Sequence, residues 1–243
     1  MNILETKNLA KHFGGVHAVD DLSLSFEKGK ITSIIGPNGS GKSTFVNVLT
    51  GIYPMDGGLI VVGGELFRKV SSPELAALGI TRTFQEVRLF NQMTVLDNIL
   101  VILTERGVFP ALAAKHTKFH LSQVKEILKK VGLWEKRNEI AANCSYGQRK
   151  LLEIARVLAM NSEVLLLDEP FAGLFPEIVK LVVSLLEEFR AAGKTVVLIE
   201  HNMELVRKLS DHVFVMDGGK LLAEGKPEEV LRAREVIEAY LGE

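Results

Sequence analysis

The stretch ITSIIGPNGSGKSTFVNVLTG, residues 31–51, decides the fold of this 243-residue chain. It begins with an apolar run at 31–36 and continues through a glycine-rich loop at 36–44. The segment that follows, 45–51, repeats its apolar residues at helical spacing. We therefore predict a strand, a loop and a helix in that order, with Gly51 at the end of the helix.

The octet GPNGSGKS within this loop matches the pattern G-x-x-x-x-G-K-[ST]. Its glycines let backbone N–H groups converge on phosphate oxygens, and the following helix points its positive end at them. Lys42 would neutralise phosphate charge, and the Ser43 hydroxyl would bind Mg²⁺. The residues predicted to bind a nucleotide here are Gly36, Pro37, Asn38, Gly39, Ser40, Gly41, Lys42, Ser43 and Thr44. The alternative is a glycine turn that merely opens a helix.

Beyond this motif, short apolar runs alternate with segments of helical spacing. The runs predicted as strands of the main sheet are residues 31–36, 80–84, 164–170, 195–200 and 212–217. The helices predicted among them are residues 73–78, 202–209, 227–233 and 235–241, and one that has Pro176 in its first turn. Strands that are apolar along their whole length require a parallel sheet covered on both faces.

Two other parts complete the predicted architecture. Residues 3–9, 22–26 and 59–65 suit short antiparallel strands, and residues 94–160 have helical apolar spacing throughout. The fold class is therefore α/β: a P-loop NTPase (RecA-like) parallel sheet core with an antiparallel β edge subdomain and an inserted α-helical subdomain. We expect residues 1–86 and 161–243 to form the core and residues 87–160 to form the helical subdomain.

The composition excludes several classes of protein. Hydrophobic residues make up 47% and charged residues 24%, which is typical of a globular chain. Lys and Arg number 29 against 30 Asp and Glu, so no overall positive field suggests a nucleic-acid partner. No run reaches the ~18 apolar residues needed to cross a bilayer. A single cysteine and the lack of a secretion signal predict a reducing, cytoplasmic setting.

Two acidic residues, Asp168 and Glu169, end the apolar run VLLLDE. Ligands bind beyond the carboxyl ends of parallel strands, so both carboxylates are expected to face the phosphate loop. Asp168 would hold Mg²⁺, directly or through water, and Glu169 would accept a proton from an attacking water. This arrangement predicts hydrolysis. The alternative is a pair of capping carboxylates.

The segment NCSYGQ, residues 143–148, places Ser145 at the start of a second helix that could bind an anion. It resembles the signature segment of ATP-binding-cassette (ABC) ATPases, usually written LSGGQ, in the form S-Y-G-Q. The resemblance implies that Ser145, Gly147 and Gln148 act in trans, closing over the nucleotide bound by the other subunit of a head-to-tail dimer.

The resemblance covers nearly the whole chain and implies further site residues. Phe13 matches the aromatic residue that stacks on adenine, Gln85 the glutamine of the flexible loop, and His201 the switch histidine. The implied catalytic residues are Glu169, His201, Gln85 and Lys42, and the implied Mg²⁺ ligands are Ser43, Gln85 and Asp168. Taken alone, Phe13 could be a core residue and His201 could cap a helix.

Two residues depart from the family pattern. Cys144 stands where leucine usually precedes the signature serine, and Phe175 stands where a small polar residue often follows Gly-Leu. Cys144 is most simply a small buried hydrophobe, and a reactive thiol of lowered pKa is the alternative. Phe175 changes the surface expected at the subunit contact.

Residues 78–100, 144–159 and 236–243 look like the ATPases of branched-chain amino-acid importers, although relatives for urea or lipopolysaccharide share some of these features. The resemblance implies ATP and Mg²⁺ as cofactors and a second ABC ATPase subunit, identical or paralogous. It also implies integral membrane permease subunits, an indirect link to a solute-binding protein, and a place on the inner face of the membrane. The alternatives are a soluble ABC-type ATPase acting on nucleic acid and, from another class, a switch GTPase or small-molecule kinase.

Overall fold

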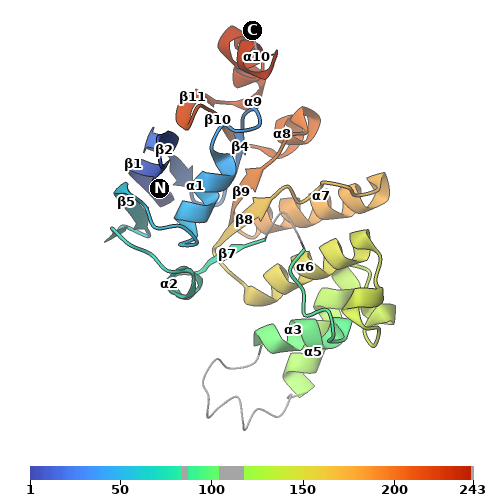
Figure 1. The fold of residues 1–243 in the computed structure, drawn as a ribbon. Helices are drawn as coiled ribbons and strands as arrows, with labels where there is room; N and C mark the ends of the chain where they lie inside the picture. Colours follow the sequence, from blue (N-terminus) through green and yellow to red (C-terminus); the bar gives the residue numbers. More distant parts are fainter. Residues whose placement is uncertain (84–86, 104–117, 242–243) are drawn as a thin grey trace. The chain divides into compact units, whose positions relative to one another are not determined.

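The computed structural model describes residues 1–83, 87–103 and 118–241, which fall into two compact units (Figure 1). The first, called the core unit below, comprises Met1–Arg82, Glu163–Glu169 and Leu185–Glu243. The second, called the helical unit, comprises Thr83–Ser162 and Pro170–Ser184. Gln85 is outside the described residues.

A six-stranded sheet in the order β11-β10-β4-β9-β8-β7 forms the centre of the core unit. Its strands are β4 (Ile31–Ile35), β7 (Ile80–Arg82), β8 (Val164–Asp168), β9 (Thr195–Ile199), β10 (His212–Asp217) and β11 (Lys220–Gly225). The pairings from β7 to β10 are parallel, and β11 is antiparallel to β10. Every residue of β4, β8 and β9 is buried, which explains why these strands lack a polar face. The predicted parallel sheet is confirmed.

A second, antiparallel sheet has the order β2-β1-β5-β6, with β3 also paired to β1. Its strands are β1 (Asn2–Phe13), β2 (Val16–Leu22), β3 (Ser25–Glu27), β5 (Gly57–Val62) and β6 (Glu65–Phe67). The single strand predicted at 22–26 is wrong, because the chain breaks between β2 and β3. The Thr6 hydroxyl donates to the Leu22 carbonyl (3.1 Å) and accepts from the Leu24 amide (3.0 Å), so a side chain supplies the hydrogen bonds at the break.

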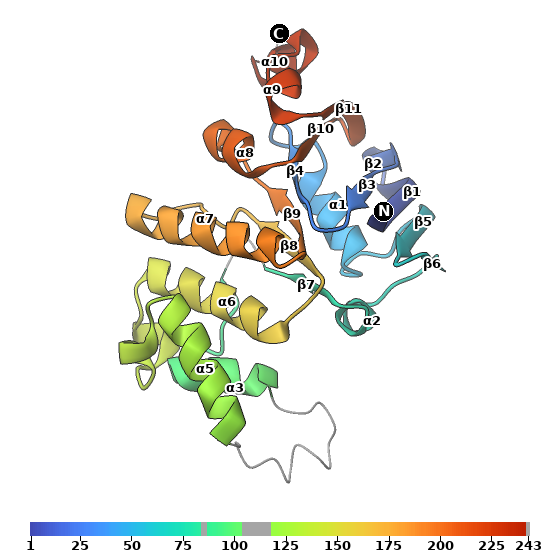
Figure 2. The same cartoon turned by 180° about the vertical axis from the view of Figure 1, so that it is seen from behind.

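Helices cover both faces of the parallel sheet in the core unit (Figure 2). They are α1 (Lys42–Leu49), α2 (Ser72–Ala77), α8 (Met203–Leu209), α9 (Pro227–Val230) and α10 (Arg234–Leu241). One hydrophobic cluster joins Phe45 and Leu49 of α1 to both sheets. A second joins Val206, Val230 and Val236 to the opposite face of the parallel sheet. The phosphate-loop helix is therefore held between two sheets.

The helical unit contains α3 (Val95–Leu103), α5 (Lys118–Lys130), α6 (Tyr146–Met160) and the first half of α7 (Pro176–Ala191). The prediction that residues 94–160 are helical throughout is wrong for 131–145, which contain only two short 3₁₀ turns. In this segment, backbone hydrogen bonds to the start of α3 take the place of helical hydrogen bonds. The Val95 amide donates to the Glu139 carbonyl, and the Leu96 amide donates to the Arg137 carbonyl. Among the described residues, no helix is long and apolar enough to span a membrane.

Candidate functional site

The phosphate loop leaves β4 at Gly36 and opens α1 at Lys42. Glycine is required at two of its positions. A Cβ atom on Gly36 (φ 150°) would lie 2.1 Å from the Met216 carbonyl oxygen, and one on Gly41 (φ 99°) would lie 2.2 Å from the Ala18 carbonyl oxygen. The loop is therefore in close contact with neighbouring backbone on two sides.

Backbone donors collect at the start of α1. The Ser40 amide donates to the Pro37 carbonyl (3.2 Å), whereas the amides of Gly41, Lys42 and Ser43 have no partner among the described residues. These amides belong to the first turn of a helix, where the macrodipole also favours negative charge. The loop thus offers the donors that a phosphate group needs.

The Lys42 side chain is folded into this loop. Its Nζ donates to the carbonyl oxygens of Gly36 (2.7 Å) and Pro37 (2.9 Å) and to the Ser40 hydroxyl (3.2 Å). Burial lowers the pKa of Lys42, and the carboxylates of Glu169 and Asp168 oppose that shift. The ammonium group is therefore already located among the loop donors, near both predicted acids. Pro37, Asn38, Gly39, Ser43 and Thr44 are at least partly exposed.

Asp168 is the last residue of β8, and its carboxylate is bound by Arg82. Arg82 Nη2 donates to Asp168 Oδ2 over 2.9 Å, and both side chains are nearly buried. The other terminal nitrogen of the guanidinium group, Nη1, donates to Asn47 Oδ1 on α1 (2.7 Å) and to Thr50 Oγ1 just after α1 (3.0 Å). Sequence analysis did not identify Arg82, because its partner Asp168 is 86 positions away in the sequence.

Glu169 and His201 are brought together at the same edge of the sheet. They follow β8 and β9, which are adjacent and parallel, with Asp168 paired to Ile199. His201 Nε2 donates to Glu169 Oε1 over 2.7 Å. Glu169 adopts a left-handed backbone conformation (φ 46°), which is uncommon for a residue with a side chain. Asn202, not His201, caps the following helix.

Phe13 lies at the end of β1 with 45% of its surface exposed, so the alternative that it is a core residue is wrong. Its ring contacts the Tyr53 ring edge to face at a centroid distance of 5.3 Å. Lys11 Nζ lies 5.3 Å from the Phe13 ring centroid. An exposed aromatic face with a nearby cation is a suitable surface for a planar ring.

The signature segment of the helical unit begins α6 with a capping box. The Gln148 amide donates to Ser145 Oγ (3.3 Å), and the Ser145 amide donates to Gln148 Oε1 (3.0 Å). A Cβ atom on Gly147 would lie 2.5 Å from Cδ1 of Ile178, so glycine here also permits close packing against α7. Cys144 is buried, and burial raises the pKa of its thiol, which favours a small buried hydrophobe over a thiol of lowered pKa.

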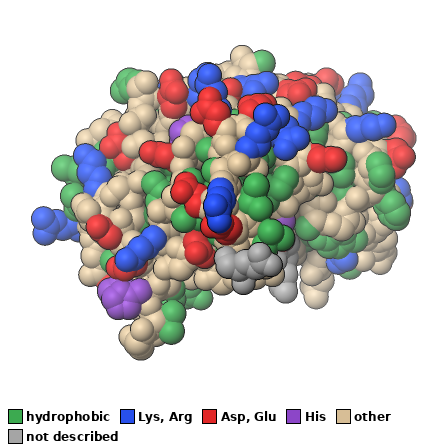
Figure 3. Space-filling model, turned by 90° about the horizontal axis from the view of Figure 1, so that it is seen from above, with side chains coloured by type: hydrophobic (Ala, Val, Ile, Leu, Met, Phe, Trp, Pro, Cys, Tyr) green, Lys and Arg blue, Asp and Glu red, His purple; other side chains and the backbone are tan. Residues whose placement is uncertain are grey.

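The C-terminal helix α10 also reaches the phosphate loop. The Gly36 amide donates to the Tyr240 hydroxyl over 2.6 Å, and burial raises the pKa of Tyr240 to about 12. Sequence analysis did not identify this residue, because the two partners are 204 positions apart. Lys/Arg and Asp/Glu side chains are interspersed on the face shown in Figure 3, in keeping with the formal net charge of -1.

A glycine-rich loop between a parallel strand and a helix, with two acids and a histidine at the same sheet edge, defines a P-loop nucleotide-binding protein. Comparisons with known proteins narrow this class. The sequence matches the family described as "ABC transporter" over residues 19–172, and the family "Branched-chain amino acid ATP-binding cassette transporter" over residues 220–243. The chain belongs to the ABC transporter family and is one of its ATP-hydrolysing, ATP-binding subunits.

Individual relatives agree with this assignment. The chain is 41% identical to the high-affinity branched-chain amino acid transport ATP-binding protein LivG of Salmonella typhimurium, over 99% of this chain and 98% of the relative. A nucleotide-free ATP-binding cassette from an ABC transporter superposes with a TM-score of 0.88 at 36% identity, covering both chains completely. A dimeric ATP-binding cassette in a post-hydrolysis state, bound to ADP and Pi, has a TM-score of 0.81 at 26% identity, over 92% of this chain and 98% of that one.

Proposed function

We propose that this subunit uses ATP hydrolysis to drive the uptake of branched-chain amino acids through separate membrane subunits. The observation that carries hydrolysis is the Glu169–His201 pair, joined over 2.7 Å at the strand ends next to the phosphate loop. The substrate assignment is supported by the match over residues 220–243 and by the name of the LivG relative. Related systems for urea or lipopolysaccharide are the alternative.

The phosphate groups of ATP would be bound by the free amides of Gly41, Lys42 and Ser43 together with the Lys42 ammonium. Phe13 would stack on the adenine ring, since its exposed face is open to a planar ligand. Lys42 would exchange its loop acceptors for phosphate oxygens, because charged acceptors form the stronger hydrogen bonds.

Mg²⁺ fits the oxygen donors available at this edge. The Ser43 hydroxyl is exposed at the start of α1, and Asp168 ends β8 with Oδ2 held by Arg82. These oxygen ligands suit a hard cation, and Gln85 would complete the set. When bound, Mg²⁺ supplies neutralisation of phosphate charge. Arg82 would fix the orientation of the Asp168 carboxylate.

Glu169 would accept a proton from the attacking water on its carboxylate, and His201 would hold that carboxylate in place through Oε1. A second subunit, identical or paralogous, would contribute Ser145, Gly147 and Gln148 to each site. Support comes from the dimeric cassette with ADP and Pi, and from the exposed side chains of Tyr146 and Phe175 near this segment. Membrane permease subunits would hold this dimer at the cytoplasmic face and receive solute from a binding protein.

The experiment is to isolate the protein with its membrane subunits from gently solubilised membranes and reconstitute the complex in vesicles with its solute-binding protein. Leucine should stimulate ATP hydrolysis and accumulate in vesicles with ATP at the cassette side, whereas urea should do neither. Stimulation by urea alone would reject the substrate assignment, and hydrolysis unaffected by Glu169→Gln would reject the catalytic one.

A further inference from the structure

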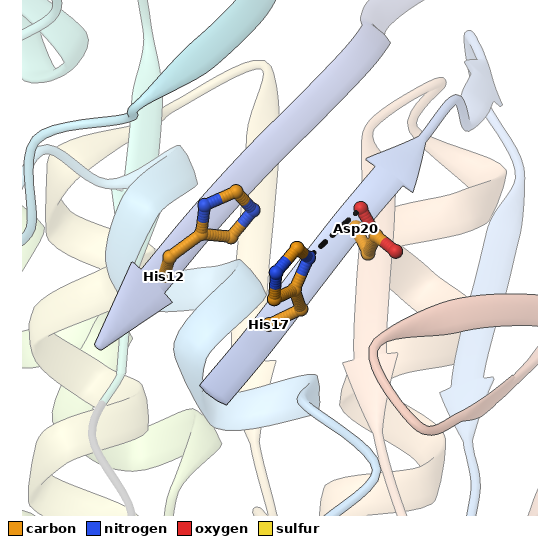
Figure 4. Close-up of side chains that lie close together, drawn as sticks. All are labelled: His12, His17 and Asp20. Carbon is orange, nitrogen blue, oxygen red and sulfur yellow. Dashed lines mark ion pairs between the residues drawn. The ribbon is translucent and has the colours of Figure 1, made fainter. Parts of the chain in front are cut away.

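Three potential metal ligands meet on the β1–β2 hairpin, at residues that the nucleotide site does not use. They are His12 on β1 and His17 and Asp20 on β2, and their ligand atoms all lie within 4.8 Å of one another. Figure 4 shows the three side chains lying together, with the dashed line marking the ion pair between His17 and Asp20. Among the described residues, this is the one group of three or more His, Cys, Asp or Glu side chains with such spacing.

The register of the hairpin explains why these residues share a face. His12 is paired directly with His17, and Lys11 is paired with Val19, so the register shifts by one residue between these pairs. In a regular strand, residues three positions apart point to opposite faces. The extra residue, Ala18, forms a bulge that brings Asp20 to the side of His17. Cross-strand pairing therefore places the imidazoles of His12 and His17 side by side, and the bulge places the Asp20 carboxylate next to them.

The cluster has unused coordinating capacity. His12 Nε2 is buried and has no hydrogen-bond partner among the described residues. His17 Nδ1 lies 3.5 Å from Asp20 Oδ1, which is long for a hydrogen bond. This distance is close to the separation of two ligand atoms in a tetrahedral Zn²⁺ site, which is about 3.4 Å when each metal–ligand bond is about 2.1 Å. The centroids of the two imidazole rings lie 4.0 Å apart and the rings are tilted by 30°. The His17 side chain is 57% exposed, so its ring has room to reorient on binding an ion.

We propose that His12, His17 and Asp20 form a binding site for a late first-row divalent metal ion such as Zn²⁺. Two imidazoles and one carboxylate suit Zn²⁺, whereas Mg²⁺ prefers an all-oxygen set. Lys220 is the neighbouring cation, with Nζ 3.2 Å from Asp20 Oδ2, and it would compete with the ion for the carboxylate. Its side chain is 66% exposed and can move away, leaving Oδ1 to the metal.

The site is separate from the proposed adenine contact. His12 and Phe13 are consecutive residues of β1, and consecutive side chains point to opposite faces of a strand. A metal ion at His12 therefore lies on the face of the hairpin away from the Phe13 ring. The proposal does not depend on the nucleotide roles assigned above.

The test is calorimetric titration of the chelator-treated, nucleotide-free chain with ZnCl₂. We expect one ion per chain, with affinity falling at least about 10-fold in His12→Ala and His17→Ala, since even outer-shell changes cost about 10–100-fold. Lys220→Met should tighten binding by removing the competing charge. His212→Ala is the matched control and should leave the affinity unchanged, because His212 lies on β10, where its ring contacts Phe214 and its ion pair is with Glu224 (3.5 Å).

Two further measurements keep the outcome unambiguous. Circular dichroism should show that the His17 variant is folded, since 57% of this side chain is exposed. Saturation with Mg²⁺ and ADP should not displace Zn²⁺. A chain that binds no Zn²⁺, folded histidine variants that keep the original affinity, or displacement of Zn²⁺ by the nucleotide would each overturn the proposal.

Discussion

Replacement of Tyr240 by Phe is expected to weaken both the core unit and its affinity for ATP. The substitution removes only the hydroxyl group, which accepts a hydrogen bond of 2.6 Å from the Gly36 amide. Gly36 is buried and begins the phosphate loop, so its amide would lose a partner that water does not readily replace. A hydrogen bond of this kind contributes about 0.5–1.5 kcal/mol, and a buried donor left unpaired costs about 1–3 kcal/mol.

A loss of about 1 kcal/mol sets the expected size of each change. For a chain of this length it should lower the melting temperature by about 2–4 °C. The same energy, if it holds the loop in its binding geometry, raises the dissociation constant for ATP about fivefold. Differential scanning calorimetry and nucleotide titration measure the two quantities. Tyr53→Phe is the control, since it removes the same group from a tyrosine whose contact with Phe13 is made by its ring.

The pH dependence supplies an independent check on the same hydroxyl group. Burial raises the pKa of Tyr240 from 10.0 to about 12, so the folded state holds the phenolic proton more tightly than the unfolded state. This contribution to stability is complete below pH 10 and is lost as the pH rises toward 12. The advantage in stability of the original protein over Tyr240→Phe should therefore shrink over that range. An unchanged melting temperature and ATP affinity in the variant would refute the proposed link between α10 and the phosphate loop.

Three other substitutions test the remaining site. Lys42→Ala removes the cation buried in the phosphate loop, so phosphate release should fall to background; normal turnover would exclude this loop as the site. Glu169→Gln retains the shape but not the proton acceptor, so the variant should bind ATP and accumulate as a dimer on gel filtration; a fully active monomer would contradict a shared site. Ser145→Arg places a bulky cation at the start of α6, so nucleotide titration should show normal binding while hydrolysis stops; unchanged hydrolysis would exclude the signature assignment.

Sequence analysis identified the site residues that lie next to a strand end. Gly36, Asp168 and His201 each follow an apolar run, and parallel strands bring their carboxyl ends to one edge. That reasoning needs only strand order and direction, which the apolar pattern indicates. The roles of these residues remain predictions, and Gln85 lies outside the described residues.

The contacts that depend on tertiary packing were not predictable in the same way. Arg82 reaches Asp168 across 86 positions, and Tyr240 reaches Gly36 across 204. Neither distance leaves a local pattern in the sequence. The break after β2 was missed for a similar reason, because the Thr6 side chain that bridges it belongs to another strand. Local periodicity predicts elements and their ends, whereas side-chain bridges depend on which elements become neighbours.

In the proposed dimer, the capping box at α6 would constrain how the signature segment meets a nucleotide. Ser145 and Gln148 satisfy each other, so neither backbone amide of this pair is left over for a ligand. The amides of Tyr146 and Gly147 lie between them in the first turn and have no partner among the described residues. A phosphate approaching from a second subunit would therefore meet these two donors and the exposed Ser145 hydroxyl. Since the box already fixes their direction, little conformational entropy would be lost when the second subunit closes.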